Sequence, residues 1–122
     1  MSKNKPTVVI GASPNADRYS YKATYSLQKH LHTVYPIGIK IGKINDLDIL
    51  INKPPLENID TVTLYVGPNN QKDWIDYIIN LKPKRIIFNP GTENSVFELL
   101  ASSKQIEVLR ACTLVLLATN QY

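Results

Sequence analysis

The sequence predicts an α/β domain built on a doubly wound parallel sheet of five strands, and three observations point to it. Short β-branched apolar runs alternate with segments of helical periodicity, as in parallel strands joined by crossover helices. The first run, Thr7–Ile10, is apolar on both faces, as in a strand covered by helices on both sides. The 122 residues fit one domain, residues 1–122, with a polar tail at residues 1–6.

The predicted elements follow one another in order along the chain. Strands are predicted at residues 7–10, 34–37, 61–66, 85–88 and 106–109. Helices are predicted at residues 20–31, 71–81 and 93–103. Ser20 is the expected N-cap of the first helix, and Ala23, Leu27 and Leu31 form its buried stripe, while Thr92 is the expected N-cap of the helix at 93–103. Residues 38–59 are expected to hold a short extended piece and a turn, and the apolar tail at 113–118 suits a helix or a strand.

The position of a ligand site follows from the strand order. With the strands numbered along the chain, the expected order is 3-2-1-4-5, which is a Rossmann-like sheet. The topological switch point then lies between the first and fourth strands. Ligands of such sheets bind outside the carboxyl ends of the strands at this point. We therefore expect a crevice between the loop that starts at Gly11 and the loop that starts at Asn89.

Composition limits the classes of partner. The formal net charge of +4 suits a phosphorylated small molecule, and the absence of a dense Lys/Arg cluster argues against nucleic acid. No run reaches the length of a membrane span and no signal peptide is recognisable, so we expect no membrane partner and a cytoplasmic location. His30 and His32 cannot face one site on a helix, and no metal site is predicted. The lone Cys112 suits a buried small side chain better than a nucleophile.

The loop after the first strand suits a phosphate. Gly11 permits a sharp turn, and the small side chains of Ala12 and Ser13 let backbone N–H groups approach an anion. Residues 11–16 form a degraded G-x-G-x-x-G/A pattern, in which Ser13 replaces the middle glycine and Ala16 takes the last position. The alternative is a tight strand-to-helix turn that binds nothing.

The end of the second strand argues against NAD. A nicotinamide-binding domain places Asp or Glu there to hold the ribose hydroxyls, but no acid occurs here before Asp46. Lys40 stands in this region instead. A lysine suits the 3′-phosphate of coenzyme A or the 2′-phosphate of NADP, although an ordinary solvated loop lysine is an equal alternative.

Four segments together resemble a known family. They are residues 9–15 with Arg18, Ser20 and Tyr21 behind them, residues 34–37, residues 60–62 leading to 66–68, and residues 89–94 with Cys112 further on. On these residues the chain, from Val8 to about Leu117, resembles the small stand-alone CoA-binding domain proteins. Their fold recurs in the α subunit of succinyl-CoA synthetase, whose catalytic histidine belongs to a second domain. We expect no counterpart of that domain within these 122 residues.

The resemblance implies three groups of ligand contacts. The pyrophosphate group is Gly11, Ala12, Ser13, Arg18 and Ser20. The group flanking the nucleotide is Pro36, Ile37, Lys40, Gly67 and Pro68. The other lip of the crevice holds Asn89, Gly91 and Asn94, near the pantetheine or acyl group. The chain departs from the family at Gly38, where an asparagine is usual, and at Gln105, where a glycine is usual.

These observations favour a binding module over an enzyme. We expect it to bind CoA or acyl-CoA and to carry no complete catalytic constellation of its own, so that a protein partner would supply any catalysis. One alternative is a small NADP-linked enzyme that uses the same first loop and Lys40. A third possibility is a domain that has lost ligand binding and acts through protein contacts.

Overall fold

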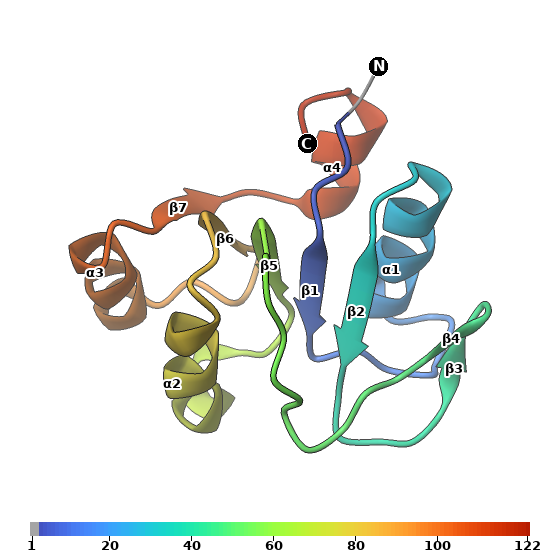
Figure 1. Ribbon diagram of the computed structural model, residues 1–122, viewed down its shortest axis with the longest axis horizontal. Coiled ribbons are helices and arrows are strands. Elements are labelled where there is room, and N and C mark those ends of the chain that lie inside the picture. Colours follow the sequence, from blue (N-terminus) through green and yellow to red (C-terminus); the bar gives the residue numbers. More distant parts are fainter. Residues whose placement is uncertain (1–2) are drawn as a thin grey trace.

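The computed structural model describes residues 3–122 as a five-stranded parallel sheet with helices on both faces, which confirms the predicted fold class (Figure 1). The strands of the sheet are β1 Thr7–Ile10, β2 Val34–Ile37, β5 Thr61–Leu64, β6 Arg85–Phe88 and β7 Glu107–Arg110. The helices are α1 Tyr19–Lys29, η1 Pro68–Asn70, α2 Lys72–Leu81, α3 Ser95–Ser103 and α4 Thr113–Ala118. A small hairpin, β3 Lys43–Ile44 and β4 Leu47–Asp48, lies in the predicted irregular region.

The order of the strands differs from the prediction. Hydrogen-bonded neighbours run β2-β1-β5-β6-β7, which is 2-1-3-4-5 when the five strands are numbered along the chain. The predicted order 3-2-1-4-5 is therefore wrong, because β5 lies in the middle of the sheet between β1 and β6. The switch point consequently falls between β1 and β5 rather than between β1 and β6.

Two properties of the strands explain this order. All four residues of β5 are fully buried, as expected of a central strand. Pro36 lies in β2 and has no N–H to donate, and a strand that contains proline fits best at the edge of a sheet. The predicted order would have placed that proline in the interior.

The helices cover the sheet in two layers. Helices α1 and α4 pack together on one face, over a core that includes Val9, Leu27 and Leu117. Helices α2 and α3 lie on the other face, where Ile78 and Phe97 belong to the larger core cluster. All five strands point the same way, so their carboxyl ends and the loops that follow them gather at one edge (Figure 1). Among the described residues, no helix is long and apolar enough to cross a membrane.

Two predicted N-caps and one predicted core residue are wrong, and all three lie at helix ends. Leu31 follows α1 with a φ of 67° and is 84% exposed, so only Ala23 and Leu27 of the predicted stripe are buried. Ser20 lies buried inside the first turn of α1, and Arg18 is the N-cap residue. Helix α3 is capped by Asn94, whose side chain accepts a hydrogen bond from the N–H of Phe97, and not by Thr92.

Candidate functional site

The switch point brings the loop after β1 against the loop after β5. Gly11 has a φ of +95°, and a Cβ added there would lie 3.0 Å from Cγ2 of Val66 and 3.1 Å from the carbonyl oxygen of Tyr65. The two loops therefore meet at a point where only glycine fits. The loop that starts at Asn89 follows β6, one strand further away than predicted.

Two backbone N–H groups of the loop after β1 already form hydrogen bonds within the protein. The N–H groups of Gly11 and Ala12 both donate to the carbonyl oxygen of Ile37, at 3.0 and 2.9 Å. These two amides join β1 to β2 and do not face a ligand, which corrects the expectation that they approach a phosphate. Pro36 and Ile37, predicted beside the nucleotide, are buried within β2.

The donors that remain are further along the loop. Ser13 is half-buried, and its Oγ accepts a hydrogen bond from the N–H of Asn15 at 3.1 Å. The N–H of Arg18 donates to the carbonyl oxygen of Asn15 at 3.1 Å, which turns the chain into α1. No side chain caps the N-terminus of this eleven-residue helix. Its first N–H groups and the partial positive charge of its N-terminus therefore have no side-chain cap, and the exposed Arg18 stands at the N-cap position. Ser20 is only 4% exposed, so its hydroxyl is directed into the protein.

Both polar atoms of the Asn89 side-chain amide form hydrogen bonds within the protein. Its Nδ2 donates to Oγ1 of Thr63 at 2.7 Å and to the carbonyl oxygen of Leu64 at 2.9 Å. Its Oδ1 accepts from the N–H of Thr113 at 2.9 Å. The side chain thereby ties β5, β6 and the start of α4 together at the carboxyl edge, and it is 2% exposed. In this structure Asn89 positions the site and is not presented to a ligand.

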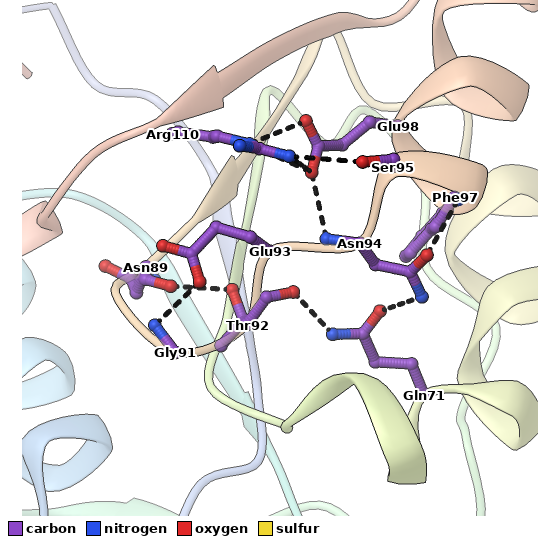
Figure 2. A network of polar contacts seen from close by, with 10 residues as sticks. All are labelled: Gln71, Asn89, Gly91, Thr92, Glu93, Asn94, Ser95, Phe97, Glu98 and Arg110. Atoms are coloured by element: carbon purple, nitrogen blue, oxygen red, sulfur yellow. Dashed lines mark hydrogen bonds and ion pairs between the residues drawn. The ribbon is translucent and has the colours of Figure 1, made fainter.

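The sequence did not reveal Gln71, whose side chain joins the loop after β5 to the loop after β6 (Figure 2). The side chain is fully buried. Its Nε2 donates to the carbonyl oxygens of Val66 at 2.9 Å and Thr92 at 2.7 Å, and its Oε1 accepts from Nδ2 of Asn94 at 2.9 Å. A glutamine just before a helix usually faces water, so nothing in the sequence distinguished it. Asn94 was predicted as a ligand contact. Its Nδ2 instead donates to Gln71, and its Oδ1 accepts from the N–H of Phe97 and so caps α3.

The outer part of the network holds the loop after β6. The N–H of Gly91 donates to Oε1 of Glu93 at 2.9 Å, so this acid closes its own turn. Glu98 accepts hydrogen bonds from the Arg110 guanidinium at 3.0 to 3.2 Å and from the N–H of Asn94 at 2.9 Å (Figure 2). Burial alone would raise the pKa of Glu98, but these hydrogen bonds outweigh it and the pKa is lowered. This pairing directs Arg110 toward α3 and commits it there, while Cys112 lies half-buried just before α4.

Open space borders two of the predicted site glycines. A Cβ added at Gly67 or at Gly91 would meet nothing within 4 Å. Gly67 follows β5 and precedes the exposed Pro68, whereas Gly91 follows β6. The carboxyl edge therefore has open space beside both of these loops.

A separate hollow of about 770 Å³ lies at the opposite edge, where the strands begin. Its lining includes Lys5, Asp60 and Lys84, which stand on the segments that enter β1, β5 and β6. Ligands of parallel α/β sheets bind outside the carboxyl ends of the strands, so we place the candidate site at the switch point and not in this hollow.

Gly38, which directly follows β2, lies in contact with the first loop. A Cβ at this position would collide with the carbonyl oxygen of Ala12. We expect Gly38→Ala to lower the free energy of unfolding by roughly 1–3 kcal/mol, because a methyl group must displace backbone. Gly67→Ala is the matched control, since its Cβ has free space and its φ is −63°. Urea denaturation measures both. Equal stability of Gly38→Ala and wild type would show that the two segments do not touch.

Comparison with known proteins shows the family of this chain. The family described as "CoA binding domain" matches residues 5–118. The chain belongs to the CoA-binding domain family. A crystal structure of an uncharacterized protein is 43% identical to this CoA-binding domain, with a TM-score of 0.96, 99% of this chain covered and 100% of that one. Among the curated proteins, none matches.

More distant structures share the fold. A protein from Thermus thermophilus, cell-free ID.343, has a TM-score of 0.83 at 17% identity, with 98% of this CoA-binding domain and 91% of that chain covered. A hypothetical protein from Pyrococcus horikoshii OT3 has a TM-score of 0.79 at 20% identity, with 93% and 81% covered. At such identities the likeness extends to the fold alone.

Proposed function

We propose that this CoA-binding domain binds CoA or acyl-CoA reversibly at its carboxyl edge and catalyses no acyl transfer by itself. The family match over residues 5–118 is the observation that carries the proposal. The site supports it, because Ser13, Arg18 and the uncapped N-terminus of α1 offer donors and positive charge to a pyrophosphate.

The remaining parts of CoA fit the neighbouring loops. The open space beside Gly67 and Gly91 suits the extended pantetheine arm. Lys40 is exposed at the end of β2 and forms no ion pair within the described residues, so it is free to meet the phosphate on the ribose. The absence of catalysis is proposed because Arg110, the cation nearest Cys112 in the sequence, is committed to Glu98.

We expect CoA to raise the melting temperature more than NAD does at the same concentration. The second strand ends without an acid to hold ribose hydroxyls, which disfavours NAD. Ligand at 100 times its Kd stabilises the native state by about 2.7 kcal/mol. Thermal unfolding followed by circular dichroism, with CoA, NADP and NAD in parallel, measures the difference.

The same experiment separates the alternatives. A larger shift with NADP than with CoA would favour the small NADP-linked enzyme, which shares the first loop and Lys40. No shift with any of the three would favour a domain that acts through protein contacts. An equal or larger rise of the melting temperature with NAD would contradict the argument that the end of the second strand disfavours NAD.

A further inference from the structure

A small hollow of about 180 Å³ lies at the edge of the sheet where the strands begin, opposite the candidate CoA site. The segment that leads into β1, the end of α1 and the end of α4 meet there (Figure 1). The polar side chains of its lining are Lys3, Lys5, His30, His32 and Asn120. Leu117 and Tyr122 complete the lining, so none of the described residues around the hollow is an Asp or a Glu. We call it the basic hollow.

Tyr122 forms a fixed wall of the basic hollow. Its hydroxyl lies 2.5 Å from Oγ1 of Thr7, and its ring centroid lies 4.9 Å from that of His32. Its carbonyl oxygen accepts hydrogen bonds from Nζ of Lys5 at 2.6 Å and from Nη2 of Arg85 at 3.0 Å. The hollow is therefore framed by packed residues and not by loose surface side chains.

His32 brings an unused donor to the basic hollow. The residue is 7% exposed, and its Nδ1 accepts a hydrogen bond from the backbone N–H of Lys5 at 3.0 Å. A ring nitrogen that accepts carries no proton, so the proton of the neutral ring lies on Nε2. Burial lowers the pKa of this ring, and three neighbouring groups lower it further, namely His30, Lys5 and Arg85. The ring therefore stays neutral at neutral pH and keeps the proton on Nε2.

This Nε2 opens onto the hollow. It forms no hydrogen bond within residues 3–122. In that part of the chain, the hydroxyl of Tyr65 is the one wholly enclosed side-chain group without a partner. Because Nε2 of His32 also has no partner and is not enclosed, it has access to the hollow that its ring lines. An acceptor placed there would receive its hydrogen bond.

The charges around the basic hollow favour an anion. The ammonium group of Lys5 keeps two of its three protons after bonding to Tyr122. Lys3 is exposed and forms no ion pair within the described residues. Asp60, the acid whose charge acts on His32, lines the larger hollow of about 770 Å³ and not this one. Positive charge thus surrounds the small hollow without a carboxylate side chain to balance it.

We propose that the basic hollow binds a phosphate group, either as inorganic phosphate or as one end of a small phosphorylated molecule. Its donors come from three segments of the chain, so they suit an anion with oxygens on all sides better than a planar carboxylate. Pockets for drug-sized ligands measure roughly 300–1,000 Å³, so this hollow suits a phosphate group and not a whole nucleotide. The larger hollow shares Lys3 and Lys5 with it and has room for the rest of a phosphorylated molecule.

An NMR titration with inorganic phosphate tests the site. Millimolar phosphate should shift the ring resonances of His32 and the methyl resonances of Leu117 saturably, whereas acetate at the same pH and ionic strength should not. Glycerol 3-phosphate separates the two sources: tighter binding than inorganic phosphate indicates a phosphorylated molecule, and equal or weaker binding indicates the free ion. Added CoA should leave the shifts unchanged, because the two sites lie at opposite edges. Absence of saturable shifts, or their loss on adding CoA, would overturn the proposal.

Two variants of His32 isolate the Nε2 donor. Asparagine places its oxygen near the position of Nδ1, so it still accepts from Lys5 but lacks the donor at Nε2. Glutamine instead places its amide nitrogen near Nε2. His32→Asn should weaken phosphate binding about tenfold, the loss of one hydrogen bond to a charged group, and His32→Gln should restore most of it. Equal affinity of a folded His32→Asn variant and wild type would remove His32 from the site.

A double variant of exposed residues avoids any loss of fold. Lys3→Gln with His30→Gln should leave the melting temperature unchanged and weaken phosphate binding about tenfold. The matched control is Lys104→Gln, which removes the same formal charge from an exposed lysine that lines neither hollow. The control should bind phosphate as wild type does. An equal loss in the control and the double variant would show a diffuse effect of net charge and overturn the site.

Discussion

Asn89→Ala should lower the free energy of unfolding by about 3 kcal/mol. Truncation leaves the hydroxyl of Thr63, the carbonyl oxygen of Leu64 and the N–H of Thr113 without the partner that the amide supplies. Each buried polar group that loses its partner costs about 1–3 kcal/mol. New hydrogen bonds among the three groups replace part of the loss, so we expect each group to contribute only about the lower value. The hydroxyls of Thr63 and Thr113 already lie 2.7 Å apart and can share part of the loss. Urea denaturation followed by circular dichroism measures the change.

The matched control is Asn80→Ala. Asn80 is exposed in α2, and alanine is the better helix former, so the free energy of unfolding should stay within about 0.5 kcal/mol of wild type. A loss below about 1 kcal/mol for Asn89→Ala would mean that the amide does not hold the carboxyl edge together. In that case Asn89 would return to the group of candidate ligand contacts.

The alternation of strands and helices was predictable because each element buries its own pattern. Val8 and Val9 fill the two opposite cores, as two-sided burial of the first strand requires. The strand order was not predicted, although Pro36 carried a usable signal for an edge strand. Leu31 misled the helix prediction, since its spacing matches the buried stripe while the helix ends at Lys29.

The site was predicted in outline and missed in detail for a physical reason. Residue type showed that Gly11 makes a tight turn, and its φ of +95° agrees. Residue type cannot show where a backbone N–H goes, and the amides of Gly11 and Ala12 are spent on Ile37. Gln71 is invisible for a similar reason, because its three partners come from loops that meet only in the fold.

We expect Ser13→Asp to weaken CoA binding by a factor of ten to a hundred without loss of fold. Ser13 lies between Ala12 and Pro14, which face Gly38 and Gly42, and its loop leads into the uncapped N-terminus of α1, where the pyrophosphate is proposed to bind. Two like charges about 4 Å apart repel by about 4 kcal/mol at the effective dielectric of a protein surface, and solvent around a half-buried side chain reduces this. A tenfold loss corresponds to about 1.4 kcal/mol.

Isothermal titration with CoA measures the affinity, and Ser13→Asn is the matched control because it adds similar bulk without charge. Asparagine should stay within about threefold of wild type, while aspartate falls well below it. The difference should shrink as salt is raised, since exposed charges are screened over about 10 Å at 0.1 M. Loss of affinity in both variants would indicate a steric effect of the longer side chain. Equal affinity of Ser13→Asp and wild type would place the pyrophosphate away from the N-terminus of α1.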